Sequence, residues 1–164
     1  MPADAGGDGG PGSRPDGGPE DGAGTPLPLS EATQVEVSKV YCGAVPSSCP
    51  GGDAPTSYLV DFVRAELTVT RCVRAPDGGL PDRPQTRRAL TPEEIAYVLE
   101  ALRGVRTTPA ERNAFDGLMH TLSLTDRTGA RTQYSPDATC GPRQYDKVIA
   151  GYMQVWEAIS TLSD

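Results

Sequence analysis

Four cysteines are the residues of this sequence with the most distinctive chemistry: Cys42, Cys49, Cys72 and Cys140. None belongs to a C-x-x-C pair, the spacing by which zinc ribbons and thioredoxin-type redox sites bring two sulfurs onto one tight turn. The even number therefore favours two structural disulfides. Four cysteines allow three pairings. We expect Cys42–Cys49, which would close a short loop, and Cys72–Cys140, which would join two distant elements.

His120 is the single histidine, and histidine is the side chain that most often acts as a general base or activates a nucleophile. It lies among leucines in a predicted strand, and no nucleophile motif accompanies it. The sequence therefore predicts no catalytic residue. The alternative is a small secreted hydrolase in which His120 works with a carboxylate such as Asp126 or Asp116.

Acidic side chains give little support for carboxylate catalysis or metal binding. Asp61 and Glu66 fall on opposite faces of one predicted strand, whereas a glycosidase needs two carboxylates across a cleft. Glu93 and Glu94 suit the first turn of a helix, where they complement the helix dipole. The sequence contains neither a calcium-binding loop nor the spacing of a transition-metal site. We expect no metal and no cofactor.

Five arginines make the one local concentration of charge outside the N-terminal stretch: Arg71, Arg74, Arg83, Arg87 and Arg88. Such a group can contact an anionic envelope component or an acidic partner protein. The alternative is a solvated loop whose arginines pair with Asp77 and Asp82. Nucleic acid is not an expected partner, because the chain has a net charge of −7 and aromatic residues do not interleave with these arginines.

Residues 1–32 are rich in Gly, Pro and Asp and have few apolar side chains. Five acidic residues against one arginine within residues 1–30 account for four of the seven net negative charges. A segment of this composition buries too little apolar surface to offset the entropy lost on ordering. We expect residues 1–32 to form a disordered tether and residues 33–164 to form a single domain.

A flexible tether ahead of a small cysteine-bearing domain resembles the mature part of a bacterial envelope lipoprotein. The resemblance covers residues 1–32 and the general layout. It implies a lipidated cysteine preceding residue 1 and a location in the periplasm, on the outer surface or, without an anchor, in the secreted fraction. The expected disulfides agree with such an oxidising compartment. Membrane contact is expected only through that anchor, because the sequence has no apolar run long enough to span a bilayer.

The first part of the domain reads as strands joined by loops. Residues 33–42 predict a strand, because Val35 and Val37 alternate with polar residues. Residues 58–73 predict one long strand on the same grounds. Residues 74–88 are dense in proline, glycine and aspartate and predict a long irregular connection.

A helix is predicted to begin at Pro92. Thr91 can cap it, and Glu94 stands at the position that completes a capping box. Gly104 is expected to end it. Residues 117–135 predict a hairpin whose turn lies at 126–129.

Residues 144–162 predict a second helix, because their apolar side chains recur at helical spacing. The predicted fold class is therefore α+β. It has an antiparallel sheet of about four strands in ββα-ββα order, with both helices packed on one face.

These observations favour a non-enzymatic binding domain, secreted or tethered to the envelope, whose partner is a protein or an anionic envelope component. Its contact surface is expected to involve the polar sheet face, the loop between Cys42 and Cys49 or the five arginines. A third possibility, beside the hydrolase, is an inhibitor or immunity-type protein that neutralises a secreted enzyme.

Overall fold

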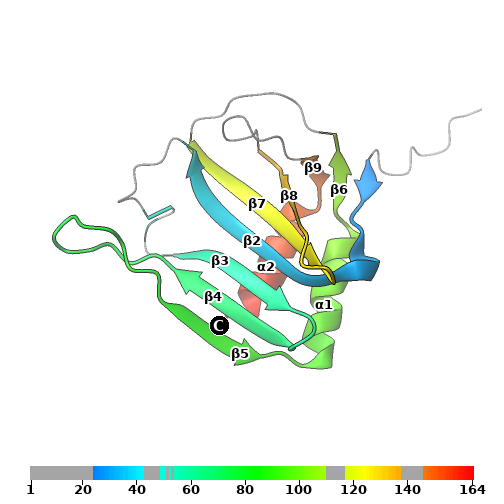
Figure 1. Cartoon of the computed structure of the whole chain (residues 1–164), viewed down its shortest axis with the longest axis horizontal. Helices are drawn as coiled ribbons and strands as arrows, with labels where there is room; N and C mark the ends of the chain where they lie inside the picture. The colour runs from blue at the N-terminus through cyan, green and yellow to red at the C-terminus, as the bar shows by residue number, and fades with distance from the viewer. Residues whose placement is uncertain (1–23, 43–48, 51, 53, 110–116, 138–145) are drawn as a thin grey trace, which may run out of the picture.

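One mixed sheet dominates the structure, and two short helices lie behind it (Figure 1). The structure is a computed structural model that describes residues 24–42, 49, 50, 52, 54–109, 117–137 and 146–164. The strands are β1 (Thr25–Pro26), β2 (Ala32–Cys42), β3 (Pro55–Asp61), β4 (Glu66–Arg71), β5 (Gln85–Ala89), β6 (Arg106–Thr108), β7 (Gly117–Asp126), β8 (Arg131–Ser135) and β9 (Asp146–Ala150). The helices are η1 (Leu29–Glu31), α1 (Pro92–Arg103) and α2 (Tyr152–Thr161).

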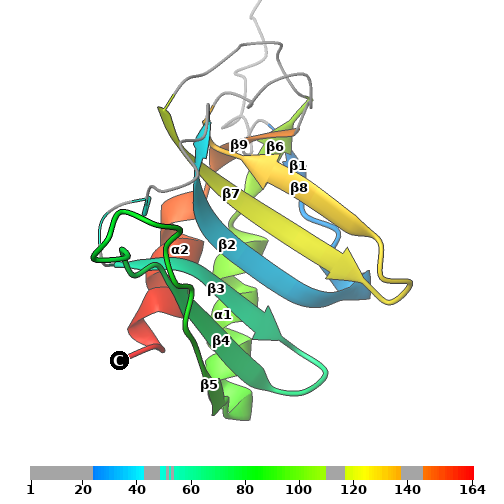
Figure 2. The same ribbon diagram turned by 60° about the vertical axis from the view of Figure 1, so that its left-hand side comes forward.

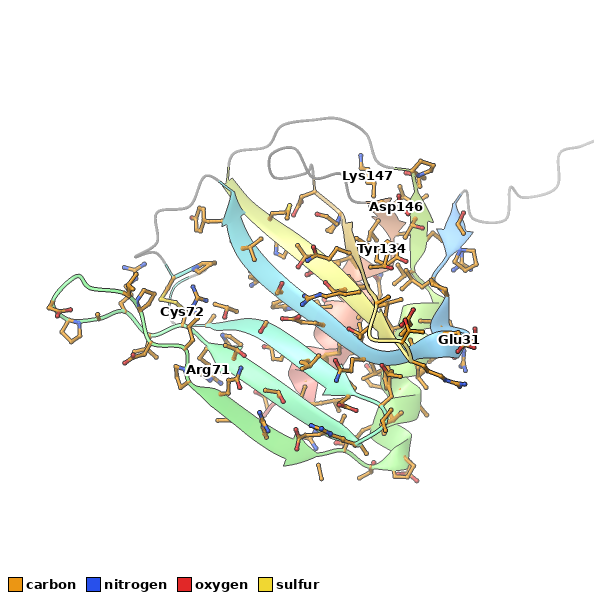
Figure 3. The ribbon with its side chains drawn as sticks, in the orientation of Figure 1. Glu31, Arg71, Cys72, Tyr134, Asp146 and Lys147 are labelled. Atoms are coloured by element: carbon orange, nitrogen blue, oxygen red, sulfur yellow. A yellow bond between two sulfur atoms is a disulfide. The ribbon has the colours of Figure 1, made fainter. Side chains whose placement is uncertain are left out.

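The strand order across the sheet is β1-β6-β9-β8-β7-β2-β3-β4-β5. Neighbours are antiparallel except β8 and β9, which run parallel with Tyr134 opposite Asp146 and Ser135 opposite Lys147 (Figure 3). The predicted fold of about four antiparallel strands in ββα-ββα order is therefore wrong. Nine strands form in the described part of the chain. Three short segments, β1, β5 and β6, add strands that were not predicted. Each of the segments 58–73 and 144–162, predicted as single elements, also contains one more strand than expected.

The segment 58–73 is a hairpin rather than one strand. The Asp61 carboxylate accepts hydrogen bonds from the backbone N–H groups of Val63 at 3.0 Å and Arg64 at 2.8 Å, which turns the chain back. Ala65 completes the turn with a φ of 50°. The alternation of apolar residues in the sequence continues through this turn, and for this reason one strand was predicted. Val63 nevertheless lies at the tip of the turn and is 77% exposed.

The segment predicted as a second helix over 144–162 divides into β9 and α2. Gly151, with a φ of 88°, separates the two elements. Val148 is buried in the sheet, and the β-branched pair Val148 and Ile149 favours a strand. Helical spacing therefore described α2 correctly and β9 wrongly, and residues 144 and 145 lie outside the described part.

Three further strands were not predicted, because each is short and lacks clear alternation. β5 begins within the predicted irregular connection 74–88 and ends one residue beyond it, at Ala89, and β6 follows α1. β1 lies within the predicted tether, and Leu27 beside it is buried in the core. The sheet thus includes residues of the segment 1–32, which was predicted to be a tether. Residues 1–23 of that segment lie outside the described part.

The first helix and the central hairpin were predicted correctly. The Thr91 hydroxyl accepts from the Glu94 N–H at 3.2 Å, and the Glu94 carboxylate accepts from the Thr91 N–H at 2.8 Å, which forms the capping box. β7 and β8 pair as expected, and the Asp126 carboxylate holds their turn by accepting from the Thr128 and Ala130 N–H groups.

The core lies between the sheet and the helices. Val37 of β2, Leu122 of β7, Leu67 of β4, Leu102 of α1 and Ile159 of α2 are all fully buried in it. The opposite face of the sheet carries mainly polar side chains, among them Ser38, Thr70 and Thr121. Neither described α-helix lies over that face in either view (Figure 2). No helix of the described residues has the length and apolar character needed to cross a bilayer.

Candidate functional site

A disulfide joins Cys49 to Cys72, with their Cα atoms 5.4 Å apart. Both expected pairings, Cys42–Cys49 and Cys72–Cys140, are therefore wrong. The observed bond forms because antiparallel pairing of β3 with β4 brings the segment before β3 beside the end of β4, where Cys72 follows Arg71 (Figure 3). Cys140 and the side chain of Cys42 lie outside the described part.

His120 packs against helix α2 rather than opening onto the polar face of the sheet. Its ring meets the rings of Tyr152 and Trp156 edge-on, at centroid distances of 5.6 and 6.2 Å. Asp137 lies beside it, with an Oδ2 oxygen 3.1 Å from Nδ1 and 2.8 Å from the His120 backbone nitrogen. The carboxylate therefore holds both the ring and the end of β7.

Neither carboxylate that the hydrolase alternative named is seen beside His120. Asp126 closes the turn at the other end of β7, and Asp116 lies outside the described residues. The partner, Asp137, was not predicted, although the register of the hairpin indicates it. Because Leu122 pairs with Tyr134 in antiparallel strands, the residues that follow Ser135 lie opposite the part of β7 that contains His120. The nearby Ser135 hydroxyl donates to the His120 carbonyl at 2.7 Å and so holds the hairpin.

The five candidate arginines do not form one patch. Arg71 and Arg74 are both exposed. Arg71 ends β4 (Figure 3), and Arg74 lies at the start of the connection to β5. Arg83 ends that connection and lies on the polar side of the sheet. Arg87 also lies on this side, and its Nε is 3.9 Å from the Glu66 carboxylate. Two of the five, Arg83 and Arg87, thus border the polar face.

Arg88, the fifth, is turned to the other side and acts as a structural clamp. Its register partner in β4 is the buried Leu67. Its guanidinium donates to both carboxylate oxygens of Glu94, at 2.8 and 3.2 Å, and to the Leu162 carbonyl at 2.6 Å. It thereby ties β5 to the start of α1 and the end of α2.

We expect Arg88→Ala to lower the free energy of unfolding, because it breaks all of these contacts at once. Urea denaturation at neutral pH measures the effect. Arg103→Ala is the matched control, since Arg103 forms a more exposed ion pair with Glu100 within α1. Equal denaturation midpoints for the two variants would contradict the clamp.

The same clamp predicts a pH dependence. Hydrogen bonds from the Arg88 side chain and from the Thr91 N–H lower the pKa of Glu94 below its ordinary value of 4.5. A carboxyl group with a lowered pKa stabilises the fold above its ordinary pKa, and this contribution is lost as the pH falls through the lowered value. The stability difference between the protein and Glu94→Gln should therefore shrink on acidification.

A hollow of about 530 Å³ lies on the polar face of the sheet. Strands β2, β3, β4, β5, β7 and β8 all contribute to it, together with the connection between β4 and β5. Its lining residues are Glu36, Ser38, Lys39, Val40, Thr56, Ser57, Thr70, Arg83, Gln85, Met119, Thr121, Arg131 and Gln133. The size suits a small ligand or a segment of a partner, and the lining favours polar groups.

Hydroxyl groups and one ion pair organise the hollow. The Ser38 and Thr121 hydroxyls lie 2.6 Å apart and are buried between β2 and β7. Arg131 of β8 reaches across β7 to Glu36 of β2 at 2.6 Å, and also donates to the Ser123 hydroxyl at 3.1 Å. The hydroxyl pair joins neighbouring strands and the ion pair spans three strands, so the surface of the hollow is held in place before any ligand binds.

The charges around the hollow leave one cation unpaired within the described part of the chain. Arg131 and Glu36 neutralise each other, and the Lys39 ammonium lies 4.6 Å from the centre of the Trp156 ring, on the helix side. Arg83 is exposed and forms no hydrogen bond or ion pair with a described residue. At the hollow, a guanidinium group without a polar partner among the described residues therefore lies beside the hydroxyl and amide groups of the lining.

Within the residues that the structure describes, no group of three or more histidine, cysteine or carboxylate side chains lies close enough together to hold a metal ion. Comparison of the chain with protein-family models, with curated proteins and with solved structures found no match.

Proposed function

We propose that the protein is a binding domain that holds an anionic partner in the polar hollow, with Arg83 as the principal contact. The single observation that carries the proposal is the Arg83 guanidinium, which has no polar partner among the described residues and lies at the edge of a hollow built from six strands. Charge-assisted hydrogen bonds from arginine to a carboxylate are among the stronger polar contacts in proteins. The partner that suits this surface best is a protein with exposed acidic side chains.

We propose further that the domain works outside the cytosol, secreted or tethered to the cell envelope. The Cys49–Cys72 disulfide supports this, because such bonds persist in oxidising compartments. The glycine-rich and acidic composition of residues 1–23 supports a spacer role for that segment. A tethered domain with a preformed polar site is suited to capturing a partner near the membrane.

Arg83→Ala is expected to weaken binding of a fluorescent oligoglutamate peptide about tenfold, the usual scale for one charge-assisted hydrogen bond. Fluorescence anisotropy in low-salt buffer measures the affinity. The melting temperature should not change, since Arg83 contacts no described residue through a polar bond. Arg103→Ala removes the same charge from the opposite side of the sheet and should bind like the unaltered protein.

Equal affinities for Arg83→Ala and Arg103→Ala would contradict the proposal, as would failure of the unaltered protein to bind the peptide. Vesicles containing phosphatidylglycerol provide a parallel probe. Arg83-dependent binding to the vesicles without binding to the peptide would assign the hollow to an anionic envelope component instead of a protein.

A further inference from the structure

Strand β5 forms one edge of the sheet, and no described strand pairs with the backbone groups on its outer side. One of these groups, the Ala89 carbonyl, already accepts a hydrogen bond from Arg88 Nη1 at 3.1 Å. The Arg71 N–H donates to the Pro84 carbonyl at 3.0 Å and the Leu90 N–H donates to the Ala65 carbonyl at 2.7 Å, so even-numbered residues of this strand bond to β4. The alternation of an antiparallel ladder then turns the N–H groups of Gln85, Arg87 and Ala89 outward. No described strand lies on that side.

The two edges of the sheet differ in their ability to accept another strand. β1, at the opposite edge, has two residues, and one is Pro26, which has no N–H to donate. β5 has five residues, Gln85–Ala89, and contains no proline. Arg88 fixes it to α1 and α2 through the clamp described above. β5 is therefore a held, extended edge that can receive a strand without first being ordered.

The charge along β5 indicates what kind of strand it would receive. Arg87 lies on the polar side with 61% of its side chain exposed, and Arg83 just precedes the strand. A second copy pairing through its own β5 would set arginines opposite arginines, which is unfavourable. Carboxylates placed on the polar side of an added strand would meet both guanidinium groups.

We propose that β5 docks an extended acidic segment of a partner protein, which adds to the sheet as a further strand. This inference rests on the proposed function and specifies the conformation of its partner. Main-chain hydrogen bonds to Gln85, Arg87 and Ala89 supply affinity that does not depend on sequence. Contacts of alternate acidic side chains with Arg87 and Arg83 supply selectivity, and the same segment borders the hollow because Arg83 and Gln85 also line it.

A synthetic peptide of alternating glutamate and valine is the probe. Residue-resolved amide hydrogen exchange by NMR should show exchange slowed at least tenfold at Gln85, Arg87 and Ala89 when the peptide saturates the protein. Thr86 and Arg88 should change little, because their N–H groups already bond to β4. Slowing without this alternation, or none at all, would overturn docking at the edge.

Ala89→Pro removes one outward N–H and leaves every charge in place. It should weaken peptide binding roughly five- to tenfold, the usual scale for one lost hydrogen bond. Ala89→Ser keeps the N–H and should bind like the unaltered protein. Amide exchange in the unaltered protein keeps the test decisive even if the proline variant folds poorly.

The two proposals fail in different ways. If Arg83→Ala weakens peptide binding but Ala89→Pro does not, and the outward amides stay unprotected, docking at β5 is overturned and the hollow remains the site. If oligoglutamate does not bind at all, the proposed function itself fails. A dimer that protects the same amides without peptide would assign the edge to a second copy and overturn the acidic partner.

Discussion

Gly151→Ala is expected to destabilise the protein by about 3–5 kcal/mol, among the larger effects of a single substitution. Gly151 has a φ of 88°, which disfavours any residue with a Cβ. A Cβ added there would lie 2.7 Å from the Gly104 carbonyl oxygen and 2.8 Å from the Val105 Cα. Both contacts are with backbone, so relief requires the end of α1 to move away from the start of α2.

Gly129→Ala separates the two causes of that loss. Gly129 has a φ of 84°, close to that of Gly151, but an added Cβ there meets nothing within 4 Å. The control should lose only about 1–2 kcal/mol, the cost of the left-handed conformation. Urea denaturation of both variants measures the difference. A loss at Gly151 no greater than that at Gly129 would show that the close approach of the two helix ends has no energetic weight.

Removing the Cys49–Cys72 disulfide by replacing both residues with serine is expected to cost about 3 kcal/mol. The bond joins residues 23 positions apart, and in the chain-entropy model this separation sets the expected magnitude. Denaturation in the absence of reductant, with the protein and the double variant side by side, measures the loss.

The disulfide also holds the base of the connection that carries Arg83. The isolated bridge between Val73 and Asp82 continues the β4–β5 pairing beyond Cys72. We therefore expect the double serine variant to bind oligoglutamate more weakly at a temperature at which it remains folded. Unaltered stability would show that the bond constrains little; unaltered affinity would separate the bond from the site.

Local chemistry was predictable wherever neighbours in the sequence determine it. The capping box of Thr91 and Glu94 and the turn that begins at Asp126 both follow from hydrogen bonds between residues a few positions apart. Sheet membership of short segments was not predictable in this way. Pairing of β1 with β6 and of β6 with β9 depends on contacts between residues that are far apart in the sequence. The spacing of apolar residues within one segment contains no information about such contacts.

The candidate site was predictable in part. The sequence named the polar sheet face and five arginines as candidates for the contact surface, but it could not separate Arg83 from Arg88. The difference depends on register: Arg88 faces the core side because it pairs with Leu67. The Cys49–Cys72 bond was missed for a related reason, since the turn at Asp61 that brings these residues together was predicted as continuous strand.

The positions of β1 and β5 at opposite ends of the sheet affect how the domain would stand on a surface (Figure 2). Residues 1–23 join the sheet through Gly24, next to β1. Eight strand-to-strand steps of about 4.8 Å separate β1 from β5, roughly 38 Å along the sheet. If the domain is tethered to the envelope through its N-terminal segment, as proposed above, β5 would lie at the end of the sheet farthest from the tether, and the width of the sheet would add to the distance from the membrane at which the partner binds.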